Sequence, residues 1–437
     1  MLCDPIDCLG GLNARVKRHL KYFGMEKYNR YKTLKQALDI QYHNISLNRV
    51  LAVEIWSIAN QTLSLSWKSV LRFCFAFNFS VLKTAEIFST YGLYNRKDHY
   101  DLYNQVMDRV SKDIPKNNLL MVNYTFSFRP LRFLRHLHKV YQSTARPTLS
   151  QKEIWWLAAQ MTYYCNTIDI LRKIDFSHTK KYIAMAGVLN VENLLTQFLK
   201  NQNVKTYSLE EGLFIGFHHN IPVDCVAYEN FESDRLLCWG DYTRNEFIKQ
   251  GIHAQHLLVS GYPKQVPPQK TTTVKSAFKR GVVLLARDSF HDANVRLLDI
   301  LAIYQQNHSC SFLLKLHPSL NYAFYEQFAR THAMSIAQPS QSLQECLNDH
   351  RWDFAIAVNT TAYYEALLSG KPCLRFQDET FDLPLGYADI FHDNQELQTL
   401  IDRLQKMPDD EYWAKVKEIL HFVIGYGIDL YKKNIMA

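Results

Sequence analysis

The chain has 437 residues, 47% of them hydrophobic and 21% charged, which is typical of a globular protein large enough for two domains of roughly 200 residues each. No stretch approaches the roughly 20 consecutive apolar residues that a membrane-spanning helix needs, and we exclude an integral membrane protein. The formal net charge of +8 suits an anionic partner. No arginine-rich tract, RNP-type pattern or helix-turn-helix signature accompanies that charge, so we expect no nucleic-acid partner.

The N-terminus lacks the basic start and the apolar stretch of a secretory signal, so we expect a cytoplasmic protein. The nine cysteines are scattered and include no CxxC pair, and we expect them to be reduced. Cys3 and Cys8 have no further cysteine pair or nearby histidine pair that would complete four zinc ligands. The sequence therefore predicts neither a metal site nor a cofactor.

The first 180 residues are rich in Tyr and Phe and have a helical character. Apolar residues recur over 48–112 and again over 151–174. We expect a helix-rich layer packed on the first domain. An aromatic run beside Trp67, Lys68 and Arg72 leaves open a second interpretation, peripheral association with the inner face of the cell membrane.

After residue 181 the pattern alternates between short apolar runs and helical segments, which indicates Rossmann-type modules. The stretch 262–279, with three prolines and three successive threonines, is typical of an interdomain linker. We expect an α/β fold with two Rossmann-like domains, residues 1–265 and 266–437, facing a cleft, with extra N-terminal helices and a last helix that crosses back. The expected strands are 182–188, 204–209, 235–239, 256–260, 282–286, 312–316, 354–358 and 372–376, and the expected helices are 190–200, 241–250, 294–305, 323–331, 361–369 and 410–426.

Two adjacent carboxylates, Glu210 and Glu211, followed by Gly212, stand at the carboxyl end of the strand expected at 204–209. Like charges held together raise one another's pKa, which prepares one of them to take a proton from an acceptor hydroxyl. Gly212 would let the backbone come close to a substrate. The alternative is a pair of ordinary solvated loop residues.

His317 ends the strand expected at 312–316, with Lys315 just before it and Pro318 just after it. A histidine at a strand end points toward the predicted cleft, where its ring can donate to a phosphate oxygen. The alternative is a histidine that merely finishes a strand.

The third candidate is Asn359, Thr360 and Thr361, which lie between an expected strand and an expected helix. Asn359 or Thr360 is a good N-cap, and Gly370 is a good C′ residue. The helix N-terminus and the two hydroxyls would bind a phosphate. Glu365, about one turn further along, would reach a ribose hydroxyl. A well-capped structural helix is the alternative.

Together these motifs resemble the acidic-acidic-Gly, His-Pro and paired Ser/Thr motifs of bacterial sialyltransferases and polysialyltransferases of the GT-B class. The resemblance covers about residues 182–376, and similar His-Pro patterns occur in capsule Kdo transferases and polyol-phosphate polymerases. It implies that Glu210 is the general base, with Glu211 as second choice. It also implies that His317, Thr360 and Thr361 hold the donor phosphate.

The resemblance further implies an inverting glycosyltransferase that moves a sugar from a nucleotide-activated donor onto a capsule, lipopolysaccharide or lipooligosaccharide glycan. A CMP-activated nonulosonate such as sialic acid is the first expectation for the donor, ahead of CMP-Kdo and UDP-hexoses. The sequence has no Asp-x-Asp triplet, so we expect metal independence. The alternatives are a polyol-phosphate transferase, a nucleotide-sugar 2-epimerase and a non-catalytic glycan-assembly protein.

Overall fold

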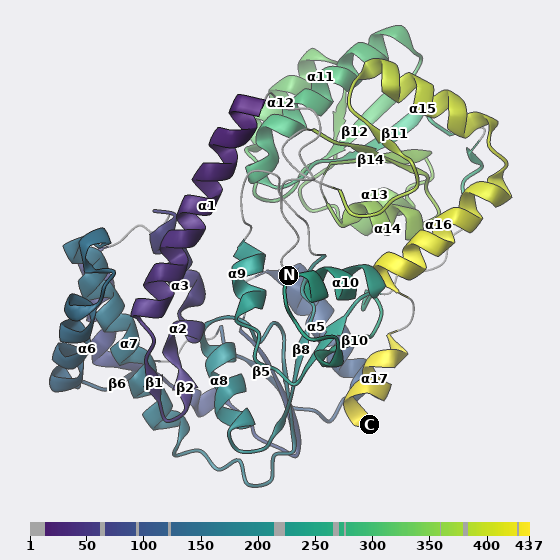
Figure 1. Cartoon of the computed structure of the whole chain (residues 1–437). Helices are drawn as coiled ribbons and strands as arrows, with labels where there is room; N and C mark the ends of the chain where they lie inside the picture. The colour runs from purple at the N-terminus through teal and green to yellow at the C-terminus, as the bar shows by residue number, and fades with distance from the viewer. Residues whose placement is uncertain are drawn as a thin grey trace.

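The computed structural model describes residues 14–437 apart from 62–65, 93–95, 121–123, 214–222, 265–270, 275–276, 359, 379–382 and 426–427. Its core is two six-stranded sheets, one in each half of the chain (Figure 1). Every neighbouring pair of strands in both sheets is parallel. This confirms the predicted GT-B-type arrangement of two α/β domains. The expected boundary between residues 265 and 266 falls outside the described residues.

The first sheet has the strand order β10–β9–β8–β7–β4–β5. Strands β7 and β8 are buried along nearly their whole length. A strand covered on both faces reads as a continuous apolar run, which is why the sequence revealed them. The strands are β4 Ile87–Tyr91, β5 Lys116–Asn118, β7 Lys181–Ala184, β8 Lys205–Leu209, β9 Arg235–Cys238 and β10 Leu257–Val259, and the helices of this domain are α5 Lys97–Val110, α8 Asn190–Lys200, α9 Val223–Glu229 and α10 Asp241–Lys249.

The helical interpretation of residues 48–112 is wrong in part. Strand β4, Ile87–Tyr91, lies inside that range and pairs with both β5 and β7 within the first sheet. Its last four residues are all buried, so it lacks the in-out alternation that marks a half-buried strand. Periodicity alone cannot separate such a run from a buried helix.

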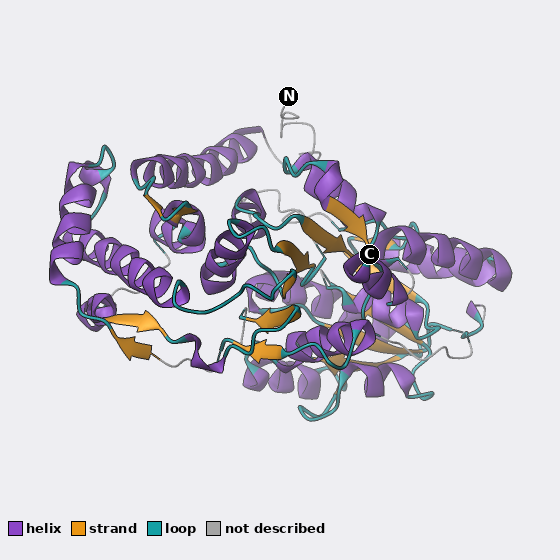
Figure 2. Ribbon diagram, turned by 90° about the horizontal axis from the view of Figure 1, so that it is seen from below, coloured by secondary structure: helices purple, strands orange, loops and turns teal. Residues whose placement is uncertain are grey.

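The remaining N-terminal elements form a helical lobe beside the first sheet (Figure 2). Its centre is α7, Gln151–Leu171, which begins with a capping box between Ser150 and Glu153, and this confirms the expected helix at 151–174. The other elements are α1 Ala14–Ala37, β1 Gln41–Tyr42, β2 Ile45–Ser46, α2 Leu47–Val50, α3 Ala52–Ala59, α4 Trp67–Val70, η2 Leu71–Cys74, β3 Phe75–Phe77, η3 Phe79–Val81, β6 Tyr124–Phe126, α6 Pro130–Gln142 and η4 Arg146–Thr148.

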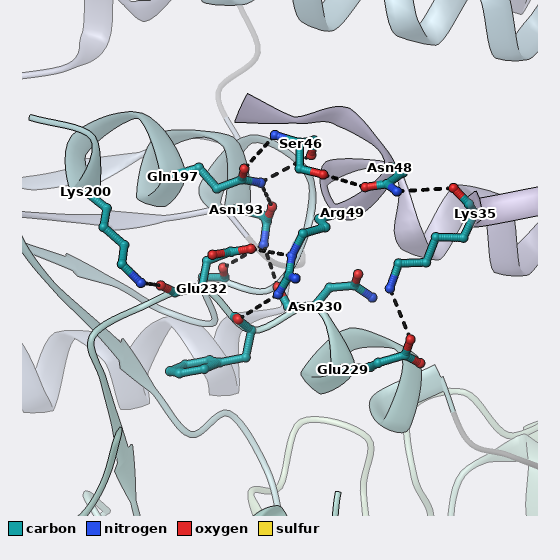
Figure 3. A network of polar contacts seen from close by, with 12 residues as sticks. Lys35, Ser46, Asn48, Arg49, Asn193, Gln197, Lys200, Glu229, Asn230 and Glu232 are labelled. Atoms are coloured by element: carbon teal, nitrogen blue, oxygen red, sulfur yellow. Dashed lines mark hydrogen bonds and ion pairs between the residues drawn. The ribbon is translucent and has the colours of Figure 1, made fainter. Parts of the chain in front are cut away.

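A polar network holds this lobe on the first domain (Figure 3). The Ser46 N–H donates to Gln197 of α8 at 2.8 Å, and the Gln197 amide donates back to the Ser46 carbonyl at 3.3 Å. Lys35 pairs with Glu229 at 3.1 Å, and Arg49 pairs with Glu232. Because these contacts are partly buried and belong to one polar network, they fix the position of the lobe on the first domain.

The second sheet has the order β13–β12–β11–β14–β15–β16. All eight residues of β14 and β15 are buried. Its elements are β11 Arg280–Leu284, η7 Asp288–Phe290, α11 His291–Asn307, β12 Ser311–Lys315, α12 Tyr322–Thr331, β13 Ser335–Ile336, α13 Leu343–Asn348, β14 Phe354–Ala357, α14 Ala362–Leu368, β15 Cys373–Phe376, β16 Ile390–Phe391 and α15 Asn394–Lys406, whereas η5 Ala254–His256 belongs to the first domain, just before β10.

The last two helices run from the second domain down to the first (Figure 1). Helix α16, Asp409–Ile424, packs on α10, and α17, Asp429–Met436, packs on α5. The contact between α16 and the first domain is close, because a Cβ added at Gly240 would lie 2.4 Å from the Val423 carbonyl oxygen. Gly240 therefore gives the end of α16 room to sit against the loop after β9.

Candidate functional site

The turns singled out in the sequence all lie at carboxyl ends of parallel strands. Glu210 directly follows β8 in the first sheet, while His317 follows β12 and Thr360 follows β14 in the second. Ligands of open α/β sheets bind at this edge. Since β12 and β14 are separated only by β11, the His317 and Thr360 turns emerge about 10 Å apart.

Glu210 is sealed inside the protein, with a side chain that is 0% exposed. The Trp239 N–H donates to its carboxylate at 2.5 Å, and the Trp239 indole donates to its carbonyl at 3.1 Å. Burial raises the pKa of Glu210 to about 8, against the opposing effects of the Trp239 N–H and the Thr243 hydroxyl. The group is therefore protonated near neutral pH and connects the ends of β8 and β9.

Glu211 and Gly212 are both partly exposed, in contrast to Glu210. A Cβ placed on Gly212 would meet no heavy atom within 4 Å. The turn is thus open at Gly212, although the Oε2 atom of Glu211 is buried, and residues 214–222 that follow lie outside the described part of the chain.

His317 begins a tight turn in which the Leu320 N–H donates to the His317 carbonyl at 3.0 Å. Pro318 occupies the position where its fixed φ favours such a turn. The Asp288 N–H donates to the Ser319 hydroxyl at 3.0 Å, and that hydroxyl donates to His317 Nδ1 at 2.8 Å. The Ser319 N–H also donates to Nδ1, at 3.2 Å. Nδ1 is an acceptor, so Nε2 carries the proton of the neutral ring and can donate it to a phosphate oxygen.

Thr360 and Thr361 precede α14 and are both partly exposed, while Asn359 lies outside the described residues. The Ala362 N–H donates to the Thr360 hydroxyl at 3.3 Å. Gly370 has φ +72, with Gly370 and Lys371 N–H groups donating to Leu367 and Ala366. This is a Schellman C-terminus, as expected from Gly370. Helix α14 is only seven residues long.

A buried ion pair fixes α14 from beneath. Arg375 of β15 pairs with Asp389 at 2.8 Å, and both side chains are at most 4% exposed. The Tyr363 hydroxyl also donates to Asp389, and the Arg375 guanidinium lies 4.5 Å from the Tyr363 ring centroid. Because Tyr363 belongs to α14, this cluster sets the height of the helix above the sheet.

The Lys315 side chain forms its hydrogen bond outside the turn that it precedes. Its ammonium donates at 2.6 Å to the Gln341 carbonyl, in the loop before α13. A donor contact from Lys315, as expected from the sequence, would require this hydrogen bond to be exchanged.

Glu365 points toward the linker and is 8% exposed. Tyr262 donates to its carboxylate at 3.1 Å, and Lys264 forms an ion pair with it. The Tyr262 ring in turn packs edge-on against Trp239, with the ring centroids 4.9 Å apart. If Glu365 bound a ribose hydroxyl, as expected from the sequence, its carboxylate would contact the ribose and these two linker residues at the same time.

These contacts form one continuous line between the two sheets: Glu210, Trp239, Tyr262 and Glu365. The acidic turn of the first domain is therefore joined to α14 of the second through two aromatic side chains. Sequence reasoning missed Trp239, Tyr262 and Lys264. The available signal was their position just after apolar strands, at the same edge as the acidic pair.

Arg287 is a further residue that sequence reasoning missed. It lies in the turn after β11, the strand between β12 and β14, and its side chain is exposed. The turn that carries it lies between the His317 and Thr360 turns, and its guanidinium lies 5.7 Å from the Phe290 ring centroid. Its signal was a basic residue directly after the expected strand 282–286.

Within the described part of the chain, no group of three or more His, Cys, Asp or Glu side chains is arranged to hold a metal ion. Neither does any helix there have the length and apolarity needed to cross a membrane.

No protein-family model and no curated protein matches the chain. Its fold matches the UDP-GlcNAc 2-epimerase of Neisseria meningitidis bound to UDP-GlcNAc, at 14% identity and TM-score 0.43, over 80% of this chain and 98% of that one. A glycosyltransferase from Rickettsia africae matches at 10% identity and TM-score 0.45, over 81% and 97%. A lipopolysaccharide outer core galactosyltransferase matches at 12% identity and TM-score 0.39, over 80% and 94%.

Proposed function

We propose that the chain is a glycosyltransferase that moves a sugar from a nucleotide-activated donor to a hydroxyl of a bacterial surface glycan. The observation that carries the proposal is the line of contacts from Glu210 through Trp239 and Tyr262 to Glu365. It joins the end of the strand that bears the paired carboxylates to α14, at the edge of the second sheet that also bears histidine, arginine and hydroxyl groups. An acid-base group and a phosphate-binding group are the two requirements of the reaction.

In this proposal Glu211 is the general base and Glu210 is a positioning residue. Glu211 is partly exposed, whereas Glu210 is buried with a pKa of about 8 and holds a proton near neutral pH. A base must be deprotonated and within reach of the acceptor hydroxyl. This reverses the order of preference expected from the sequence.

The reaction is a single displacement. The acceptor hydroxyl gives its proton to Glu211 while its oxygen attacks the anomeric carbon, and the bond from that carbon to the donor phosphate oxygen breaks. The negative charge that develops on the leaving phosphate is met by His317 Nε2–H, by Arg287 and by the hydroxyls of Thr360 and Thr361. The products are the extended glycan and the free nucleotide.

The donor follows from the motif resemblance, which favours a CMP-activated nonulosonate, with CMP-Kdo and UDP-sugars as the next candidates. Calorimetry with CMP, UDP, CDP and GDP identifies the nucleotide. We expect one of them to bind, and Arg287→Gln to weaken that binding by roughly tenfold or more, since a hydrogen bond to a charged group contributes about 1.5–3 kcal/mol.

Arg280→Gln is the matched control for Arg287→Gln. Arg280 lies at the opposite end of β11 and pairs with Asp353 at 2.8 Å, so its loss removes the same charge from the far edge of the sheet. Equal affinities in all three proteins would remove Arg287 from the site. If none of the nucleotides binds, the proposed function fails.

Incubation of the purified chain with the matching nucleotide sugar separates transfer from its rivals. A glycosyltransferase releases the nucleotide faster when a glycan acceptor is added, and the acceptor gains mass. An altered sugar formed from the donor alone would instead identify a 2-epimerase. Binding without turnover would indicate a glycan-assembly protein.

A further inference from the structure

Exposed large apolar side chains are concentrated on the helical lobe. Of the fourteen described residues of this kind, nine lie between positions 67 and 141. We name eight of them the aromatic face: Trp67, Leu71, Phe75, Tyr124, Phe126, Phe128, Leu131 and Leu134, which are 37–78% exposed. Single exposed apolar residues are normal, but a cluster marks an interaction surface.

Ring contacts connect the aromatic residues of the aromatic face, directly or through rings that lie beneath it. The Phe75 centroid lies 6.3 Å from that of Tyr124 and 6.0 Å from that of Phe126, and Phe126 lies 6.3 Å from Phe128. From Phe128 the contacts continue at 4.2–6.3 Å through Phe73, Phe133 and Trp155 to Trp67. The rings on strand pair β3–β6, turn η2 and helices α4 and α6 therefore belong to one cluster.

The aromatic face is held rigidly from below by α7. Asn166 of α7 is 0% exposed and donates to the carbonyls of Phe73, Phe75 and Ser127 at 2.8–3.3 Å. Arg132 of α6 pairs with Asp169 of α7 at 2.9 Å. Since the buried Asn166 amide and the partly exposed Arg132–Asp169 pair anchor the backbone of the face on α7, its apolar side chains stay displayed instead of folding inward.

The segments that form the aromatic face carry charges of one sign only. The sequence has no Asp or Glu from position 55 to 85 or from 114 to 152. Lys68, Arg129 and Arg135 are exposed among the apolar residues of the face. Arg72, expected beside them, is turned inward instead, with its guanidinium 4.1 Å from the Tyr163 ring centroid.

We infer that the aromatic face docks on the surface of a lipid bilayer with anionic headgroups. Aromatic rings and leucines enter the boundary between headgroups and acyl chains, while neighbouring arginines and lysines bind lipid phosphates. A second copy of the chain is a poorer occupant, because self-association would bring the same three cations face to face. The inference does not depend on the proposed transfer reaction.

Sedimentation of the full chain with vesicles tests this docking. We expect binding to vesicles of phosphatidylcholine mixed with phosphatidylglycerol, weaker binding to pure phosphatidylcholine, and release at high salt. Phe126→Ser with Leu131→Ser should lower the partition coefficient by roughly tenfold per side chain. Arg129→Gln with Arg135→Gln should lower it by roughly fivefold per charge.

Matched controls come from the second domain. Phe324→Ser with Leu385→Ser removes two exposed apolar side chains there, and Arg330→Gln removes an exposed cation. Both controls should bind vesicles like the wild type, and melting curves verify that every variant is folded. Equal binding by face variants and controls would overturn the inference, as would a wild type that ignores anionic vesicles. A wild-type dimer in solution that the face variants convert to monomer would assign the face to a second copy instead.

Discussion

The turns after β8 and β12 both lie at the carboxyl end of a parallel strand, one in each domain, yet their titratable side chains differ in burial. Glu210 is 0% exposed and accepts a hydrogen bond from the end of the neighbouring strand. His317 is partly exposed, and its ring is oriented within its own turn by Ser319. A strand end places a residue at the functional edge, but the loop beside it decides whether solvent or substrate can reach the side chain.

The largest effect on the rate of transfer is expected for Glu211→Gln, which tests the difference between the buried and the partly exposed carboxylate. The variant keeps the size of the side chain but cannot accept the acceptor proton, so transfer should fall by roughly 10²- to 10⁴-fold with donor affinity nearly unchanged. Glu210→Gln should retain most of its activity, because it imitates the protonated form already present. Steady-state kinetics with one donor and acceptor measure both. A dead Glu210→Gln beside an active Glu211→Gln would reverse the assignment.

The burial of Glu210 also predicts a pH dependence of stability. Its folded pKa of about 8 lies above the ordinary value of 4.5, so the unfolded chain loses its proton first as pH rises. The free energy of unfolding should therefore fall across the window between these values, by about 1.4 kcal/mol per pH unit and roughly 5 kcal/mol in all. Urea unfolding at several pH values measures it.

Glu210→Gln is the reference for that measurement, because it removes only this proton. The pKa of His136 is lowered by burial to about 4 and acts in the opposite direction, but it remains in both proteins. Parallel stability curves for wild type and variant would show that Glu210 has no raised pKa.

On the other side of the comparison, His317→Ala should lower turnover by on the order of 10²-fold if the ring assists departure of the phosphate. Ser319→Ala should have a smaller effect in the same direction, because it removes one of the two donors that hold Nδ1 as an acceptor. His308→Ala, at the opposite edge of the sheet, is the control. Full activity of His317→Ala would remove the residue from the site.

The smallest effect is expected for Thr360→Ala. The variant loses the hydroxyl that accepts from the Ala362 N–H, which costs about 1 kcal/mol of stability. Nucleotide binding should also weaken, and Thr360→Ser should restore both properties. Melting temperature and calorimetry separate them: a lower melting temperature with unchanged nucleotide affinity would mean that the hydroxyl serves only the helix.

The α/β organisation after residue 181 could be predicted because its signals are local. The helix expected at 190–200 is α8, Asn190–Lys200, and the helix expected at 361–369 differs from α14 by one residue at each end. Buried parallel strands, Gly370 and the turn at Pro318 are encoded within a few neighbouring residues. The first 180 residues were predicted less well, since β4 acquires its strand neighbours only when distant segments pair with it.

The sequence by itself determined which residue types stand at the ends of the strands, because strand and helix periodicity place them there. Only the tertiary structure decided which of those groups are accessible. Glu210 accepts a hydrogen bond from Trp239, 29 positions away, and Glu365 accepts one from Tyr262, 103 positions away. The exposure of the aromatic face likewise depends on α7, which packs beneath α6 and β3. Burial and pKa are properties of contacts between segments remote in the chain, so no local pattern encodes them.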